Sequence, residues 1–306
     1  MINMKKTTYT FTTSLLTAFL VLLSVTGCNN PGNAGDSFSV AFMTDIHLQP
    51  ERNAVAGFTK ALDTVNSLKP AFILTGGDLI MDALGQSYGR ADSLYVLYQE
   101  TIKKAEAPVY NTMGNHEIYG IYSRSGADPA HPEYGEKMYE KRIGPLYYSF
   151  MHEGWKFMIL NSVEDTHRNK YVGLIDSVQI AWIEDELDKT DPEIPIVIST
   201  HIPFISVMTQ RYGGSTVAND SSLIVYNSSP VLDLFREHNL KLVLQGHLHV
   251  LEDSYYEGVH YITGGAVSAA WWKGPYLTCE EGFLWLTFGR DDFTWKYIDY
   301  NWEPEK

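Results

Sequence analysis

Seven metal-capable side chains each follow closely on a stretch that predicts a buried β-strand, and this arrangement constrains the fold most. They are Asp45, His47, Asp78, Asn115, His201, His247 and His249. The apolar stretches before them end near residues 43, 75, 112, 200 and 245. Because the carboxyl ends of parallel strands meet at one edge of a sheet, we expect these side chains to lie together.

Helical and strand patterns alternate along most of the chain. Strands are predicted at 38–43, 71–75, 109–112, 147–151, 156–161, 194–200, 240–245, 260–263, 282–288 and 293–300, and helices at 52–69, 93–105, 177–188 and 230–238. Segments 119–145 and 213–229 are predicted to be irregular loops. Such alternation favours an α/β fold with a mostly parallel sheet and right-handed crossovers.

The chemistry of the seven side chains fits a pair of transition-metal ions. Two carboxylates, one amide oxygen and four imidazoles form a mixed oxygen and nitrogen set without a thiolate, which favours Mn, Fe or Zn over calcium. Seven ligands are too many for one tetrahedral ion. They suffice for two ions that share a bridging carboxylate and keep positions open for water and substrate.

Each motif alone is a common turn or helix start, but all five together in this order are hard to reach by chance. The motifs are Asp45-Ile46-His47, Gly77-Asp78, Gly114-Asn115-His116-Glu117, His201 and Gly246-His247-Leu248-His249. The series resembles that of the calcineurin-like metallophosphoesterases over about residues 40–250. The resemblance implies a four-layer α/β/β/α sandwich and a hydrolase of phosphomonoesters or phosphodiesters, in which hydroxide activated by two metals attacks phosphorus in line.

The resemblance also implies roles for single residues. One ion would be held by Asp45, His47, Asp78 and His249. The second would be held by Asp78, Asn115, His201 and His247, with Asp78 as the bridge. His116 would face the leaving group as a proton or hydrogen-bond donor. The alternative is that His116 only bonds Asp45 or a loop carbonyl.

The charge of the chain limits its partners. The sequence contains 23 basic and 37 acidic side chains, for a formal net charge of −14. This balance argues against binding to a nucleic-acid polymer or docking on anionic lipid, because both need a basic face. A small phosphoester can still bind where cations occupy the site.

The first residues have the pattern of an export signal. Lys5 and Lys6 precede an apolar run at 15–25, and small residues then lead to Cys28. The pattern predicts a lipoprotein signal peptide at 1–27, lipidation of Cys28, a tether at 28–37 and one domain at 38–306. The protein would be anchored in the cell envelope, at the periplasmic face or outer membrane. An uncleaved anchor helix or an ordinary signal peptide is the alternative.

Two further questions stay open at the level of sequence. Segment 264–275, which contains Trp271 and Trp272, is either core packing or a wall of the substrate site. A different class of function is a lipid-anchored protein that binds glycans or other ligands and has a non-catalytic metal site. An intact metal site that serves only structure or partner docking is a third. The sequence defines neither the substrate nor the oligomeric state.

Overall fold

The strands form two mixed sheets and one two-stranded ribbon. The computed structural model describes residues 37–277 and 279–304, which belong to one compact unit. The first sheet has the order β13 (Phe293–Asp299), β12 (Gly282–Phe288), β1 (Phe38–Met43), β2 (Phe72–Thr75) and β3 (Val109–Tyr110). The second has the order β10 (Leu251–Tyr256), β11 (Val259–Gly264), β9 (Asn239–Gln245), β8 (Pro195–Ser199), β5 (Trp155–Ile159) and β4 (Tyr148–His152). Strands β6 (Val163–Asp165) and β7 (Tyr171–Gly173) form the ribbon.

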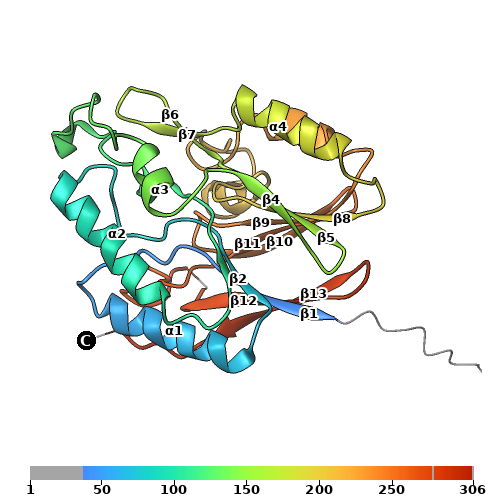
Figure 1. The fold of residues 1–306 in the computed structure, drawn as a ribbon, viewed down its shortest axis with the longest axis horizontal. Coiled ribbons are helices and arrows are strands. Elements are labelled where there is room, and N and C mark those ends of the chain that lie inside the picture. Colours follow the sequence, from blue (N-terminus) through green and yellow to red (C-terminus); the bar gives the residue numbers. More distant parts are fainter. Residues whose placement is uncertain (1–36, 278, 305–306) are drawn as a thin grey trace, which may run out of the picture. The chain divides into compact units, whose positions relative to one another are not determined.

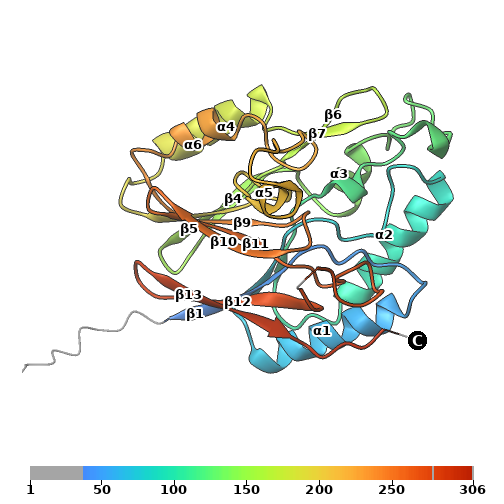
Figure 2. The same cartoon turned by 180° about the vertical axis from the view of Figure 1, so that it is seen from behind.

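Helices cover the outer face of each sheet. They are α1 (Ala54–Leu68), α2 (Tyr88–Ile102), α3 (Lys137–Arg142), α4 (Ser177–Asp188), α5 (Met208–Gly213) and α6 (Ser228–Asp233), with 3-10 turns at Asn115–Glu117 and Ser123–Ser125. Helices α1 and α2 lie outside the first sheet, and α4 and α6 lie outside the second (Figures 1 and 2). The layers therefore run α/β/β/α, and the predicted four-layer sandwich is confirmed.

Alternation of side chains along the strands explains why the two sheets pack face to face. In β1, Val40 and Phe42 point into an apolar layer between the sheets, while Ala41 and Met43 pack under the helices. The inner layer draws on both sheets, for example through Phe157 of β5. Because successive side chains of a strand point to opposite faces, a central strand buried on both faces must be apolar throughout.

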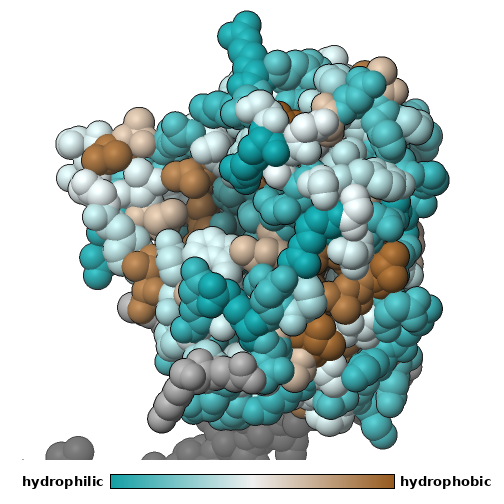
Figure 3. Space-filling model, turned by 90° about the vertical axis from the view of Figure 1, so that its left-hand side faces the viewer, coloured by the Kyte–Doolittle hydropathy of each residue, from teal (hydrophilic) through white to brown (hydrophobic). Residues whose placement is uncertain are grey.

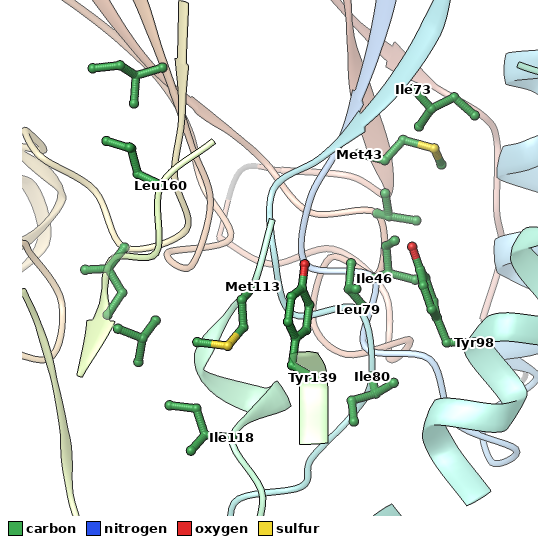
Figure 4. Close-up of a cluster of buried hydrophobic side chains, with 14 of the residues drawn as sticks. Met43, Ile46, Ile73, Leu79, Ile80, Tyr98, Met113, Ile118, Tyr139 and Leu160 are labelled. Atoms are coloured by element: carbon green, nitrogen blue, oxygen red, sulfur yellow. The ribbon is translucent and has the colours of Figure 1, made fainter. Parts of the chain in front are cut away.

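The core beneath the helices holds the loops that carry the candidate ligands. Leu79 and Ile80 directly follow Asp78, and Met113 lies two residues before Asn115. All three apolar side chains are fully buried in the cluster that also contains residues of α1, α2 and α3. Figure 4 shows part of this cluster, with Leu79, Ile80 and Met113 drawn among side chains of β1, β2 and α2. Packing of the neighbours thus fixes where the two ligand loops run.

Several predicted elements are correct, but the predicted strand directions are not. Helix α4 and strand β1 have the predicted bounds, and β4 and β5 form the predicted hairpin through Glu153 and Gly154, both at positive φ. The prediction of a mostly parallel sheet was wrong, because both large sheets are mixed. Pairs such as β1–β2 and β8–β9 are parallel, but β12 pairs with β1 in the antiparallel sense, as do β13 with β12 and β10 with β11.

Elements with weak apolar patterns were missed or misplaced. Strand β10 is largely exposed, and the ribbon β6–β7 is short, so neither has a clear apolar period. Helix α2 begins at Tyr88 rather than residue 93, because the Ser87 hydroxyl accepts the amide of Arg90 and caps the helix there. The predicted loop 119–145 contains α3, and the helix predicted at 230–238 runs over Ser228–Asp233.

The predictions for the N-terminus concern residues outside those that the structure describes. The signal peptide 1–27, the lipidated Cys28 and most of the tether 28–37 lie outside the described residues, so those boundaries stay predictions. Within residues 37–277 and 279–304, no helix has the length and apolar character that a membrane crossing requires.

Candidate metal centre

The seven predicted ligands come from loops at the carboxyl ends of strands in both sheets. Strands β1, β2 and β3 of the first sheet lead to Asp45 and His47, to Asp78 and to Asn115. Strands β8 and β9 of the second sheet lead to His201 and to the pair His247 and His249. Figure 3 turns the face where β1 and β2 end toward the viewer, and its residues are mainly hydrophilic. The structure thus brings together all the segments that the sequence singled out.

One cluster of donors is formed by Asp45, His47 and His249. The Nε2 atom of His249 lies 3.2 Å from Oδ1 of Asp45 and 3.0 Å from Nε2 of His47. The Nδ1–H of His249 donates to the carbonyl of Ala269 at 2.5 Å. This bond places the proton on Nδ1 and leaves the Nε2 lone pair directed at Asp45 and His47.

A second cluster is formed by Asp78, His201 and His247, with Asn115 beside it. The Nε2 atom of His201 lies 3.2 Å from Oδ2 of Asp78, 3.1 Å from Oδ1 of Asn115 and 3.2 Å from Nδ1 of His247. The Nδ1–H of His201 donates to the carbonyl of Gly76 at 2.8 Å.

His247, like His201 and His249, has one ring nitrogen bonded to a backbone carbonyl. Its Nε2–H donates to the carbonyl of Ser222 at 2.9 Å, which leaves the Nδ1 lone pair directed at His201. The converging atoms of the second cluster are therefore all acceptors. Acceptors held this close repel one another unless a cation or a proton lies between them.

Asp78 connects the two clusters. Its Oδ2 atom lies 3.2 Å from Nε2 of His201 and 3.6 Å from Nε2 of His47, and the amide of His116 donates to Oδ1 at 2.9 Å. Asp45 is held in a similar way, because the hydroxyl of Thr44 donates to its Oδ2 at 2.7 Å. The donor set and the fixed tautomers fit two transition-metal ions that share the Asp78 carboxylate.

Burial and the charges of the site shift the pKa values of its members in different directions. Burial opposes the charge of Asp78, but His201 and His116 hold its pKa well below the usual range. Burial also opposes protonation of His201, yet the charges of Asp78 and Asp45 raise the pKa of His201 to about 9. Burial and the nearby His201 lower the pKa of His247 to about 4. The carboxylates thus favour a positive charge at His201, beside Asp78.

The backbone at the ligands is strained. Positive φ values occur at Asp45 (55°), His47 (46°), Asp78 (52°), His247 (70°) and His249 (55°). Non-glycine residues adopt this region rarely, and it costs on the order of 1–3 kcal/mol for each residue. Such strain persists where surrounding contacts impose it, as the buried neighbours do here.

Glu117 supports the ligand loops from below. One carboxylate oxygen accepts the amides of Leu79 (2.8 Å) and Ile80 (3.1 Å), and the other accepts those of Asp78 (3.0 Å) and Gly114 (2.7 Å). The side chain is completely buried. Glu117 thus ties the loop after β2 to the loop after β3, and it uses both oxygens to do so.

His116 is partly exposed, unlike the fully buried His47 and His201. Its side chain is 22% exposed, whereas those of His47 and His201 are 0% exposed. Its Nδ1–H donates to the carbonyl of Met81, and its Nε2 lies 3.8 Å from Oδ2 of Asp78. The loop carbonyl is therefore a partner of His116, and the opposite ring nitrogen faces the bridging carboxylate from the solvent side.

The two tryptophans of segment 264–275 take opposite positions. Trp272 is buried, packs against Gly57 of α1 and donates its indole N–H to the carbonyls of Ile46 and His47 at 3.0 and 3.1 Å. Trp271 is half-buried, and its ring lies on that of His249 with centroids 4.4 Å apart. The core interpretation therefore holds for Trp272, while Trp271 borders the first cluster.

The partners that fix the histidine rings were not found from the sequence. They are the backbone carbonyls of Gly76, Met81, Ser222 and Ala269. Every residue has a carbonyl, so no side-chain pattern signals which ones are used. Thr44, which donates to Asp45, was also missed, although its place directly before Asp45 was a usable signal.

The four-layer fold and the converging donors define a metalloprotein with its centre at the strand ends. The family model of calcineurin-like phosphoesterases matches residues 38–251. The chain therefore belongs to the calcineurin-like phosphoesterase family and is a metal-dependent hydrolase of phosphoric esters.

Solved structures agree with this fold. A dimetal phosphatase from Danio rerio is similar with a TM-score of 0.58 at 15% identity, over 86% of this chain and 99% of that one. GAP50 of Plasmodium, described as the anchor in the inner membrane complex, is similar with a TM-score of 0.55 at 13% identity, over 87% of this chain and 85% of that one. A search of curated proteins found no match to this chain.

Proposed function

We propose that the protein hydrolyses phosphomonoesters or phosphodiesters with two divalent ions of Mn, Fe or Zn. The first ion would be held by Asp45, His47 and His249, the second by Asn115, His201 and His247, with Asp78 shared. The observation that carries this proposal is the convergence of lone pairs from five chain segments, with histidine tautomers fixed by backbone carbonyls. When bound, the ions would supply Lewis-acid charge and activate water for attack on phosphorus.

The side chains around the ions have distinct tasks. Asp45 and Asp78 supply the negative charge that holds the ions, and their own hydrogen bonds fix the carboxylate planes. His116 would donate a proton or a hydrogen bond from Nε2 to the departing oxygen, since Nδ1 is already engaged by Met81. Its exposure gives a substrate access to this atom, and access is lacking at the fully buried His47 and His201.

Removal and return of metal tests the proposal. Protein stripped by a chelator is expected to lose about 10³-fold in hydrolysis of p-nitrophenyl phosphate or bis-p-nitrophenyl phosphate, because several kcal/mol of transition-state stabilisation come from the ions. Reloading with Mn, Zn or Fe should restore turnover at two ions per chain, measured by elemental analysis. The preferred ester would separate a monoesterase from a diesterase. A folded, fully loaded protein that turns over neither ester would favour the ligand-binding function instead.

We further propose that the protein is anchored in the cell envelope through a lipid on Cys28. Support comes from the sequence alone, in the basic residues, apolar run and small residues that precede this cysteine. The expected result is that metabolic labelling with palmitate marks the protein, and that Cys28→Ala abolishes the label and shifts the protein to the soluble fraction. Unlabelled protein in the membrane fraction would instead indicate an uncleaved anchor helix.

A further inference from the structure

Beside the first cluster, formed by Asp45, His47 and His249, lies an aromatic ring that does not itself offer a ligand to a metal. Trp271 lies on His249 with ring centroids 4.4 Å apart and planes inclined by 35°, and 5.9 Å from His47. Tyr276 lies 5.7 Å from Trp271 and 5.9 Å from His249. Two aromatic rings therefore form one side of the first cluster, beside the residues that would hold its ion.

The loop that carries Trp271 is fixed to the ligand segment by several hydrogen bonds. The amide and hydroxyl of Ser268 both donate to the carbonyl of Asp45, at 3.2 and 2.7 Å. His249 donates to the carbonyl of Ala269, and Trp272 donates to the carbonyls of Ile46 and His47. Bonds on both sides of Trp271 thus hold its backbone at a set position relative to the cluster.

The local backbone is strained in a way that places neighbouring tryptophans in different environments. Ala269, Trp271 and Trp272 have φ values of 40°, 53° and 67°. For bulky residues this region is costly, and such strain concentrates at binding sites. Its effect here is that Trp272 enters the core while Trp271 stays half-buried at the metal centre. Burial of apolar area alone would favour both indoles in the core.

Several residues after Trp272 are open to solvent. Lys273 is exposed, Leu277 is 49% exposed, and Tyr276 is half-buried. A ring that entered beside the first cluster would therefore meet Trp271 without displacing the core. A pre-positioned indole binds a planar ring with little loss of conformational entropy.

We propose that Trp271, supported by Tyr276, binds a planar aromatic group of the phosphoester substrate, such as a nucleobase or an aryl group. This inference rests on the proposed function, since it requires that the metal centre binds the phosphoryl group. Trp271 is then a specificity-determining residue that favours aromatic over alkyl esters.

Phosphonates test this proposal, because the phosphorus–carbon bond is not hydrolysed and binding is measured without turnover. The metal-loaded protein is titrated calorimetrically with phenylphosphonate, benzylphosphonate and methylphosphonate. We expect at least one aryl compound to bind about tenfold more tightly than methylphosphonate, as one good aromatic contact provides. Trp271→Leu should abolish this preference, and Trp271→Phe should keep most of it.

The controls separate substrate binding from support of the metal ligand. Trp182→Leu alters another half-buried tryptophan, on α4, and should leave the preference unchanged. Metal content of Trp271→Leu should match that of the wild type. Equal weakening of all three phosphonates, loss of metal, or no aryl preference in the wild type would overturn the proposal. Failure of the proposed function is distinct, because it would appear as absent turnover of both nitrophenyl esters.

Discussion

An Asp78→Asn variant is expected to lose about 10³-fold or more in phosphoester hydrolysis together with most of its bound metal. The carboxylate lies between the two clusters, and an amide keeps one oxygen but removes the charge that holds both ions. The loss corresponds to several kcal/mol of transition-state stabilisation. Turnover and elemental analysis measure the two effects, and Asp63→Asn on the exposed face of α1 is the matched control.

The same assay distinguishes a ligand from a proton donor. His116→Gln should lower the turnover rate by about 10²-fold or more, as removal of a general acid does, while metal content stays at the wild-type value. The Asp78→Asn variant, in contrast, would lose both turnover and bound metal. If Asp78→Asn kept more than a tenth of the activity with full metal content, the bridging assignment would be wrong. If His116→Gln lost metal, its role would be that of a ligand.

A Glu117→Ala variant is expected to lose about 3–5 kcal/mol of unfolding free energy. Four backbone amides would lose a shared side-chain acceptor in a fully buried place, and each unsatisfied group costs about 1–3 kcal/mol before relaxation or entry of water. Denaturant unfolding of the metal-free protein measures the loss without a contribution from bound ions.

Two further variants sharpen the test of Glu117. Glu117→Gln keeps one acceptor oxygen, so two amides stay bonded and the loss should be intermediate. Glu100→Ala on the exposed surface of α2 removes a carboxylate that pairs with Lys103, and should change stability by less than about 0.5 kcal/mol. A Glu117→Ala protein as stable as Glu100→Ala would show that water replaces the carboxylate at no cost.

The sequence predicted that the seven metal-capable side chains lie together because their chemistry and their place after strands act together. Asp45 follows a strand whose bounds were predicted correctly, and His201 follows another that was placed within a residue at each end. The four-layer arrangement came from the family resemblance and not from periodicity. Apolar runs show that a strand is buried, but they do not show which of two sheets it joins.

Other features had no signal in the sequence for a physical reason. Trp271 and Trp272 are adjacent and chemically identical, and their different environments follow from backbone angles that no local composition reveals. The carbonyls of Ser222 and Ala269 orient ligand rings only because the fold brings distant loops to them. Strand β10 lies at a sheet edge, where exposed side chains hide the apolar period.

The pairing of β1 with β12 sets the order in which this molecule can be completed. Val40 lies opposite Leu286 in that antiparallel pair, so the first strand has its full set of neighbours only when nearly the whole chain is present. Contacts of such long sequence separation slow folding, because the entropy of loop closure is spent before they form. Until β12 is available, the edge of β1 that pairs with it stays unpaired. An unpaired sheet edge is prone to aggregation. A chaperone that shields Phe38–Met43 until β12 is available would therefore raise the yield of folded protein.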